Sequence, residues 1–293
     1  GIIFFYAVAR IIIIIFALFV LLNNIVENNG YNIMTMAVDS TEKYDASLVK
    51  PVILGGGIAG LATAVALKNI AGISPIILEK SSLSSFQNVQ VGGAVQFGPN
   101  GLKALRAIGG EALMQKCIQS GSIIKGNAMI FPGMPHKPTF FPDTTEEDND
   151  GLPKVLVRWG IVRELLVQHL SPETTILTEA GGDVCGYEAT KIERNIILLP
   201  KGTNESTIMD RDPANLIVSA EGVRSKFRYL VNHNKDRFGE NEEDLTALIN
   251  NDVKDSGRIN LKAIVPRDLD DSFKPGYTYA YFAQNAGVAC FAG

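Results

Sequence analysis

Apolar residues are spread very unevenly along the chain, and the first segment differs from everything that follows. From residue 2 to residue 22 every position is apolar or aromatic except Arg10, about the 20 residues that a membrane-spanning helix needs. The second half of this stretch also matches the apolar core of a signal peptide. Three interpretations stay open: a removed targeting signal, a retained anchor, or a stretch upstream of a start at Met34 or Met36. Residues 1–33 are therefore left out of the fold prediction.

The next pattern predicts a buried strand, a helix and a second buried strand. Residues 51–54 form a short apolar run, and apolar positions then recur at helical spacing, at Ile58, Leu61, Ala62 and Val65. We expect the helix to end at Ala71-Gly72. A second apolar run, residues 75–78, follows and is closed by Glu79. This order predicts a parallel β-α-β unit and hence an α/β fold.

Between the first strand and the helix lies a glycine fingerprint. Gly55, Gly57 and Gly60 fill the three glycine positions of G-x-G-x-x-G, where they permit the turn, the approach of pyrophosphate and close helix packing. The free backbone N–H groups at the helix start form an anion site. Glu79 stands where such folds place a ribose-binding carboxylate. The pattern predicts an adenine dinucleotide site, and the alternative is a structural turn with a solvated Glu79.

The remaining pattern is coarser. A helix is expected over residues 101–107, with its start at Pro99 or Asn100 and its end at Gly109. Strands and turns of a substrate-facing sheet are expected within 122–141, followed by an acidic loop over 142–151. Residues 155–160 lead into a helix with Arg163, and residues 174–177 are expected to form a strand that returns to the nucleotide sheet. A meander up to Met209 and strands over 261–265 and 277–291 complete the prediction.

Composition and charge exclude several classes of function. With 27 Lys and Arg against 31 Asp and Glu, the chain has no basic excess for nucleic-acid binding. Its three cysteines, Cys117, Cys185 and Cys290, are far apart and form no C-x-x-C pair, so we expect buried free thiols rather than zinc ligands. The three histidines have no ligand spacing, and we predict no metal site. A P-loop is excluded because Leu61-Ala62 stands where Lys and Ser or Thr are required.

Three further segments carry a specific resemblance. They are the glycine-rich segment 92–109, the segment Ile161-Val-Arg-Glu-Leu-Leu166, and the segment 214–228 with its Glu221-Gly222. We consider them together with Gly55-Gly-Gly-Ile-Ala-Gly60 and Glu79-Lys80. The chain resembles the single-component flavin monooxygenases of the aromatic-hydroxylase, kynurenine-monooxygenase and zeaxanthin-epoxidase type. In that family FAD occupies the glycine turn, an arginine of the Arg-x-x-Leu helix start lies beside FAD, and an Asp-Gly motif serves both FAD and reduced nicotinamide.

The resemblance implies which residues hold the cofactor. They are Gly55, Gly57, Ile58, Ala59, Gly60, Glu79, Lys80, Arg163, Glu221 and Gly222. This chain departs from the family in the second motif, where Glu221 replaces Asp, Ser219 replaces Gly and Asn215 replaces Asp. The family's third motif, Gly-Asp-Ala-Ala-His, would come after residue 293, so the chain is expected to be C-terminally truncated. Trp159, the only tryptophan, is interpreted as a core or interface aromatic.

The implied fold is a Rossmann-like FAD-binding domain, a three-layer sheet with a β-meander, interleaved with a mixed α+β substrate domain. We assign 48–115 and 154–230 to the FAD-binding domain and 116–153 and 231–293 to an incomplete substrate domain. If residues 2–22 are real, the protein is expected in an organelle such as a plastid or at a membrane, and otherwise in the cytoplasm.

The implied function is an FAD-dependent monooxygenase. It would use NAD(P)H and O₂ to hydroxylate or epoxidise an apolar aromatic or isoprenoid substrate through a flavin hydroperoxide, and the cofactor would supply the chemistry. No catalytic side chain is identified. Two alternatives stay open: a truncated, non-catalytic paralogue that binds FAD or another nucleotide, and another type of flavin-dependent oxidoreductase.

Overall fold

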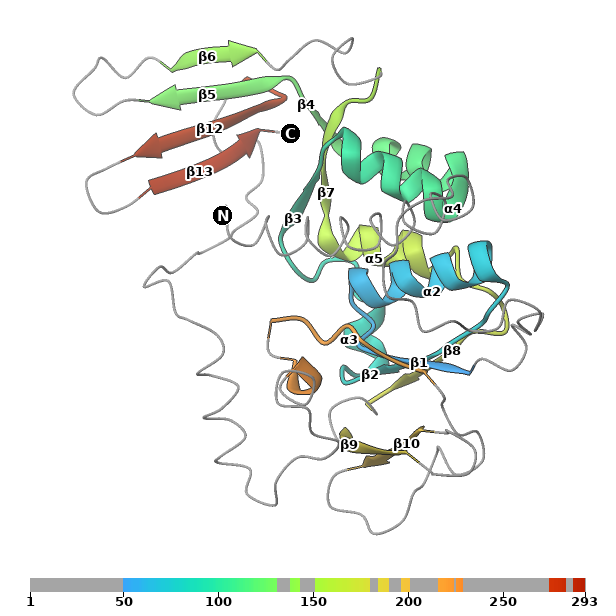
Figure 1. Ribbon diagram of the computed structural model, residues 1–293. Helices are drawn as coiled ribbons and strands as arrows, with labels where there is room; N and C mark the ends of the chain where they lie inside the picture. The colour runs from blue at the N-terminus through green and yellow to red at the C-terminus, as the bar shows by residue number, and fades with distance from the viewer. Residues whose placement is uncertain are drawn as a thin grey trace, which may run out of the picture. The chain divides into compact units, whose positions relative to one another are not determined.

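The structure is a computed structural model that describes residues 50–130, 138–142, 151–179, 184–189, 196–200, 216–223, 225–228, 274–282 and 287–292. The chain forms two compact units that alternate along the sequence. Unit 1 comprises Gly1–Phe86 and Leu170–Asn260, and unit 2 comprises Gln87–His169 and Leu261–Gly293. Figure 1 shows the helices and strands of both.

A four-stranded parallel sheet lies at the centre of unit 1. In spatial order its strands are β11 (Leu216–Ser219), β1 (Pro51–Leu54), β2 (Ile76–Glu79) and β8 (Thr175–Thr178). All four residues of β1 are buried, as expected for an inner strand of a parallel sheet. The predicted β-α-β unit is confirmed, and so is the return of residues 174–177 to this sheet. The carboxyl ends of β1, β2 and β11 therefore meet at one edge.

Helix α2 (Ile58–Ala71) connects β1 to β2 and buries Leu61, Ala64 and Val65 completely. It ends where the sequence predicts, because Gly72 takes the left-handed conformation with φ 71° and donates its N–H to the carbonyl of Lys68 at 2.9 Å. Two further elements of unit 1 are α3 (Leu83–Gln87) and the antiparallel pair β9 (Val184–Ala189) and β10 (Ile196–Pro200).

Unit 2 contains a three-stranded antiparallel sheet, β3 (Ala94–Phe97), β7 (Lys154–Arg158) and β4 (Ser122–Ile124). Helices α4 (Pro99–Gln119) and α5 (Trp159–Val167) pack on it. The predicted helix end at Gly109 is confirmed for the first of the two helical segments that make up α4. Gly110, with φ 77°, interrupts the helix, but a second helical segment continues to Gln119. It does so because its apolar face, with Leu113, Met114 and Cys117, stays buried.

A second sheet of unit 2 has the strand order β13 (Gly287–Ala292), β12 (Tyr277–Phe282), β5 (Gly126–Ile130) and β6 (Thr139–Pro142). Its inner pair, β5 and β12, is parallel, and both outer pairs are antiparallel. Phe140 meets Tyr277 and Tyr279 edge to face, with ring centroids 5.0 and 6.2 Å apart. The strands predicted within 122–141 and 277–291 are confirmed, whereas 261–265 and the acidic stretch 143–150 lie outside the described residues.

The unit boundaries fall at other places than the predicted domain boundaries. Residues 87–115 belong to unit 2 because β3 pairs with β7 and α4 packs on the same sheet. The cofactor and substrate roles of the two domains stay predictions.

None of the described helices is long and apolar enough to cross a membrane. The apolar segment 2–22 lies outside the described residues, so the three interpretations of it stay predictions. Of the three cysteine side chains only that of Cys117 is described. It is a buried free thiol, as expected, and burial raises its pKa to about 11.

Candidate nucleotide-binding site

The turn between β1 and α2 is built so that only glycine fits two of its positions. Gly55 has φ 104°, and its N–H donates to the carbonyl of Leu78 at 2.7 Å. A side chain on Gly60 would collide with the carbonyl oxygen of Gly55. The middle glycine of the fingerprint differs, because a Cβ on Gly57 would meet nothing within 4 Å. The first and third glycines thus shape the turn, and the second leaves open space beside it.

Helix α2 begins without a side-chain cap. Its N-cap is Gly57 in an extended conformation, and its first turn contains no acidic residue. The first hydrogen bond of the helix runs from the N–H of Leu61 to the carbonyl of Gly57 at 3.0 Å. In the described part of the chain, the N–H groups of Ile58, Ala59 and Gly60 have no protein acceptor. These donors and the helix dipole favour an anion here.

Glu79, the last residue of β2, is bound to the glycine turn. Its Oε2 accepts the N–H of Gly56 at 2.6 Å, and its Oε1 accepts the N–H of Ser81 at 2.8 Å and the hydroxyl of Ser81 at 2.6 Å. The residue is only 8% exposed, which contradicts the alternative of a solvated carboxylate. Lys80 is exposed.

Two opposing effects set the protonation of Glu79. Burial raises the pKa, but the hydrogen bonds from Ser81 and Gly56 and the charge of Lys80 together bring the pKa below its ordinary value of 4.5. The carboxylate is therefore ionised at neutral pH. A carboxylate has about four acceptor positions, and the three bonds to Glu79 leave one position on Oε2 unused.

The second motif lies against the first. The N–H of Ala220 donates to the carbonyl of Leu54 at 2.8 Å, and a Cβ on Gly55 would stand 2.6 Å from the carbonyl oxygen of Ala220. Unit 1 thus brings together the glycine turn, Glu79 and the segment 220–222. Gly222, with φ 85°, is exposed, and no atom lies within 4 Å of its Cβ position.

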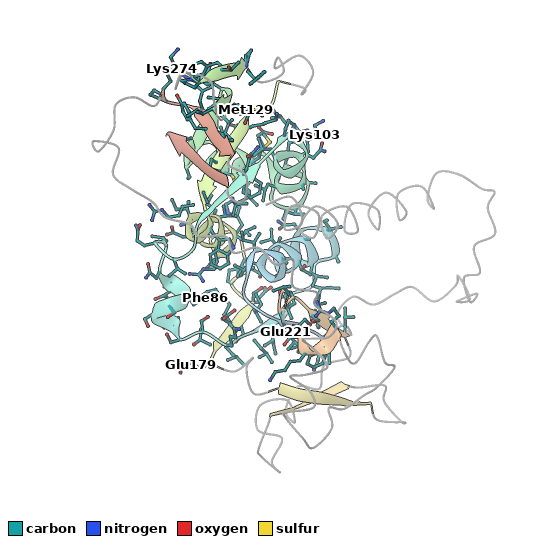
Figure 2. All side chains as sticks on the ribbon, turned by 90° about the vertical axis from the view of Figure 1, so that its left-hand side faces the viewer. Phe86, Lys103, Met129, Glu179, Glu221 and Lys274 are labelled. Atoms are coloured by element: carbon teal, nitrogen blue, oxygen red, sulfur yellow. The ribbon has the colours of Figure 1, made fainter. Side chains whose placement is uncertain are left out.

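Glu221 turns back onto its own motif, next to the short helical turn 225–228 (Figure 2). Its Oε2 accepts the hydroxyl of Ser225 at 2.9 Å, the N–H of Phe227 at 3.2 Å and the hydroxyl of Ser219 at 3.3 Å. Glu221 and Ser219, two of the three departures from the family pattern in this motif, are thus bonded to each other. Glu221 therefore caps its own turn.

Arg163 belongs to unit 2, where α5 carries it. It is 5% exposed, its Nη2 donates to the carbonyl of Asn88 at 3.2 Å, and its guanidinium carbon lies 4.8 Å from the ring centre of Trp159. The cofactor role assigned to Arg163 stays a prediction. The sequence analysis did not find Ser81 or Asn88, and the only signal for Ser81 is its place two residues after the acid that closes β2.

Metal ligands and histidines add no further site among the described residues. They contain no group of three or more His, Cys, Asp or Glu that could hold a metal ion. His169 lies at the end of α5, with its Nδ1 2.7 Å from the carbonyl oxygen of Leu165. His136 and His233 lie outside the described residues.

A sequence comparison identifies one curated relative. No family model matches the chain. The chain is 34% identical over 85 residues to a 3-hydroxybenzoate 6-hydroxylase from Klebsiella oxytoca, a match that covers 29% of this chain and 20% of the relative. The resemblance to the aromatic-hydroxylase type is confirmed. The match extends over only a fifth of the relative's length.

A comparison with solved structures gives matches of low sequence identity. A variant of Klebsiella pneumoniae HpxO complexed with FAD matches with a TM-score of 0.48 and 15% identity, over 83% of this chain and 54% of that one. CmlS, a flavin-dependent halogenase, matches with a TM-score of 0.49 and 17% identity, over 82% of this chain and 38% of that one.

Proposed function

We propose that this chain is part of an FAD-dependent monooxygenase that uses NAD(P)H and O₂ to oxygenate an apolar aromatic or isoprenoid substrate. The observation that carries the proposal is the open, uncapped start of α2 at Gly57, together with the buried Glu79 at the end of β2. A dinucleotide needs both an anion site and a ribose acceptor, and unit 1 presents them on adjacent strands.

The residues of unit 1 fit FAD in three respects. The N–H groups of Ile58, Ala59 and Gly60, which have no acceptor among the described residues, suit a pyrophosphate. The remaining acceptor position on Glu79 suits a ribose hydroxyl. In the second motif, the buried Nη2 of Arg228 has no hydrogen-bond partner in the described part of the chain, and a bound anionic group would supply one.

FAD, when bound, would supply the redox chemistry by accepting a hydride from NAD(P)H and delivering the electrons to O₂. In the balanced reaction one oxygen atom enters the substrate, the other leaves as water, and NAD(P)H with one proton is consumed. The protein contributes binding and orientation. Glu79 fixes the glycine turn through the N–H of Gly56, and the start of α2 provides donors that need no rearrangement.

The aromatic class of substrate is favoured by the name of the curated relative, a hydroxybenzoate hydroxylase. The assignment of substrate binding to unit 2 rests on the sequence resemblance. A membrane-associated lipid substrate would require that residues 2–22 be an anchor, which stays a prediction.

The test compares two glycine-to-alanine variants. Gly57→Ala places a methyl group in open space at a φ of −73°, so we expect an unchanged melting temperature but at least tenfold weaker FAD binding, because the methyl group would occupy the place of the pyrophosphate. Gly98→Ala is the matched control. Gly98 is also an extended helix N-cap, with φ −88° and an empty Cβ position, and we expect no change in FAD affinity.

FAD affinity is measured by titration, following quenching of flavin fluorescence. A folded wild-type chain that binds no FAD would overturn the proposal. Equal affinities of wild type and Gly57→Ala would overturn the placement of the pyrophosphate. Bleaching of the bound flavin by NADH or NADPH, followed by oxygenation of an aromatic substrate, tests the remaining parts.

A further inference from the structure

Glu79 accepts hydrogen bonds on both of its oxygens, but the two oxygens are not equally occupied. Oε1 accepts the N–H of Ser81 at 2.8 Å and the hydroxyl of Ser81 at 2.6 Å. The described residues give Oε2 a single bond, from the N–H of Gly56 at 2.6 Å. Because a carboxylate oxygen has about two acceptor positions, Ser81 fills Oε1. The unused position of Glu79 therefore lies on Oε2, beside the glycine turn.

Ser81 is itself attached to a third strand. Its carbonyl accepts the N–H of Glu179 at 3.1 Å, one residue beyond the β2–β8 pairing, in which Glu79 stands opposite Thr178. Among the described residues other than glycine, Glu179 alone has a positive φ, at 63°, a conformation that persists where the surrounding contacts impose it. The bonds thus connect the β1–α2 turn, the end of β2 and the end of β8, all within unit 1.

Phe86 of α3, labelled in Figure 2, lies beside the same carboxylate. A Cβ on Gly56 would stand 2.8 Å from Phe86 Cε2 and 3.0 Å from Glu79 Oε2. Phe86 is 6% exposed and Glu79 is 8% exposed. A hydrogen bond to a carboxylate is stronger where water is excluded, so the ring of Phe86 strengthens the bonds that hold Glu79.

The elements around Glu79 bring few charges to it. Strands β1, β8 and β11 and helix α3 contain no charged residue, and α2 carries its one charged residue, Lys68, in its last turn. The side chain of Glu179 is exposed, and Glu221 is bonded within its own motif. The charge that lowers the pKa of Glu79 is that of its neighbour Lys80. Hydrogen bonds therefore have a large part in fixing this carboxylate.

We propose that Ser81 and Phe86 are positioning residues, which fix Glu79 so that it accepts a single ribose hydroxyl of the ligand, through Oε2. The inference rests on the proposed function for its ligand. It narrows that function, because a carboxylate with two open oxygens could accept two adjacent hydroxyls, whereas Glu79 has room for one.

The first experiment needs no ligand and measures how Ser81 is coupled to Glu79 in the full chain. Chemical denaturation across the acid range gives the stability of wild type, Ser81→Ala, Glu79→Gln and the double variant. Burial raises the pKa of Glu79, but the bonds from Ser81 and Gly56 and the charge of Lys80 bring it below 4.5. The carboxylate therefore stabilises the fold above its ordinary pKa, and this contribution is lost as the pH falls through the folded-state pKa.

Removal of the Ser81 hydroxyl should raise the folded-state pKa of Glu79. We expect Ser81→Ala to reduce the contribution of Glu79 at neutral pH and to lose it at a higher pH than wild type does. Ser81→Thr keeps a hydroxyl and should retain the wild-type profile. Ser74→Ala, the matched control, removes a hydroxyl bond to the exposed Glu173 and should leave the contribution of Glu79 unchanged. An unchanged contribution in Ser81→Ala overturns the inference.

The second experiment compares the affinities of ADP, 2′-deoxy-ADP and 3′-deoxy-ADP, because ADP contains the ribose and pyrophosphate that unit 1 is proposed to bind. For wild type we expect one deoxy analogue to bind about tenfold more weakly than ADP and the other to bind within about twofold, since one hydroxyl meets the charged acceptor. In Ser81→Ala, ADP should bind more weakly, and the tenfold difference should shrink. Losses of equal size for the two analogues, or a loss for neither, overturn the inference.

A glycine and phenylalanine pair tests the part of Phe86. Gly56→Ala places a methyl group against the ring and the carboxylate, and we expect it to weaken ADP binding about tenfold. Phe86→Leu gives the methyl group room while keeping an apolar cover, so the double variant should recover most of that loss. Leu83→Ala, at an exposed position of α3, is the matched control and should not restore binding to Gly56→Ala. No recovery in Gly56→Ala/Phe86→Leu overturns the role of Phe86.

The outcomes separate this inference from the proposed function. A wild type that binds neither FAD nor ADP overturns the proposed function and the ligand contact together, while the first experiment still decides whether Ser81 fixes Glu79. A Ser81→Ala variant that binds FAD and ADP as tightly as wild type, with the same discrimination between the deoxy analogues, overturns the inference and leaves the proposed function standing.

Discussion

Two glutamates of unit 1, Glu79 and Glu221, each accept three hydrogen bonds, but one connects two separate segments and the other connects residues of a single segment. Glu79 joins two segments, since it bonds Gly56 in the β1–α2 turn and Ser81 after β2. In the described part of the chain, all hydrogen bonds to Glu221 come from residues 219–227. The number of hydrogen bonds to a carboxylate is therefore a poor guide to its function. Its partners show whether it holds a ligand-binding turn or closes its own loop.

The largest effect is expected at Glu79. Glu79→Ala leaves the buried N–H of Gly56 without an acceptor, which costs about 1–3 kcal/mol of unfolding free energy, and it removes the proposed ribose acceptor. We expect FAD affinity to fall by a factor of ten or more. Chemical denaturation and FAD titration measure the two losses separately, and an FAD affinity unchanged in Glu79→Ala would contradict the proposed ribose contact.

The conservative variant Glu79→Gln adds a test by pH. The pKa of Glu79 is lowered in the folded protein, so its ionised form stabilises the fold above the ordinary pKa of 4.5. That contribution is lost as the pH falls through the folded-state value. Wild type should therefore exceed Glu79→Gln in stability at pH 7, and the difference should shrink below about pH 4.

A smaller effect is expected at Glu221. Glu221→Ala removes an acceptor for the N–H of Phe227 at the start of the turn 225–228, and loss of such a cap costs about 1 kcal/mol. Because its Oε2 already bonds the motif itself, we expect FAD affinity to change by less than threefold. A loss of affinity as large as in Glu79→Ala would mean that Glu221 holds the cofactor, as the family resemblance implies.

Local pattern was enough to predict the first motif. The apolar run 51–54, the glycine spacing and Glu79 specify strand, turn, helix and acid within about 30 residues, and each contact there follows from neighbours in sequence or from the β1–β2 pairing. The end of α2 at Gly72 was predictable because a left-handed glycine stops a helix.

Long-range pairing was not predictable in the same way. No local signal shows that β12 joins β5 in parallel, or that β3 and α4 belong to unit 2. The continuation of α4 beyond Gly110 depends on burial of Leu113 and Met114, which glycine spacing does not reveal. The inward turn of Glu221 depends on Ser219 and Ser225, and the partners of Arg163 come from a loop about 75 residues earlier.

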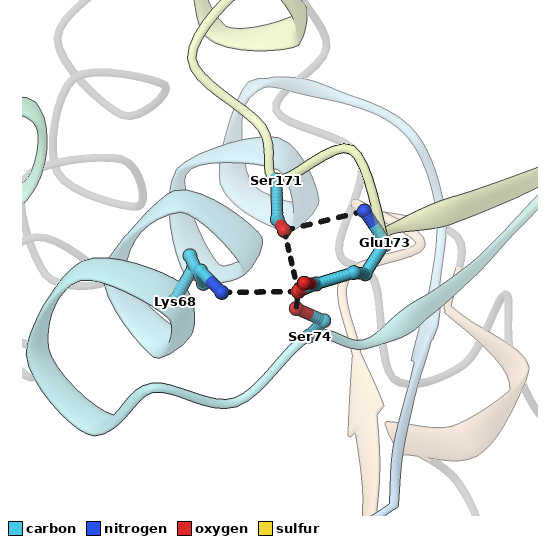
Figure 3. Close-up of polar contacts among 4 residues, drawn as sticks. All are labelled: Lys68, Ser74, Ser171 and Glu173. Atoms are coloured by element: carbon cyan, nitrogen blue, oxygen red, sulfur yellow. Dashed lines mark hydrogen bonds and ion pairs between the residues drawn. The ribbon is translucent and has the colours of Figure 1, made fainter.

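The smallest effect is expected at a third carboxylate, that of Glu173. It serves as an exposed reference for Glu79 and Glu221. Glu173 Oε2 accepts Lys68 Nζ at 3.0 Å and the hydroxyls of Ser74 and Ser171, each at 2.9 Å (Figure 3). Hydrogen bonds from Lys68, Ser171 and Ser74, in that order, and the charge of Lys68 lower the pKa of Glu173 to about 2. Its side chain is nevertheless 69% exposed, so solvent and salt weaken these contacts.

Glu173→Gln should therefore lower the melting temperature only slightly at pH 7 and leave FAD affinity unchanged. The direction with pH follows from the lowered pKa: the stabilisation is present above the ordinary value of 4.5 and is lost as the pH falls through about 2. Added salt should reduce the difference from wild type, whereas the buried Glu79 should respond to salt much less. We infer that burial and bonds between separate segments, rather than the number of hydrogen bonds, determine how much a carboxylate contributes to stability and FAD binding. A loss in Glu173→Gln as large as that in Glu79→Gln would contradict this inference.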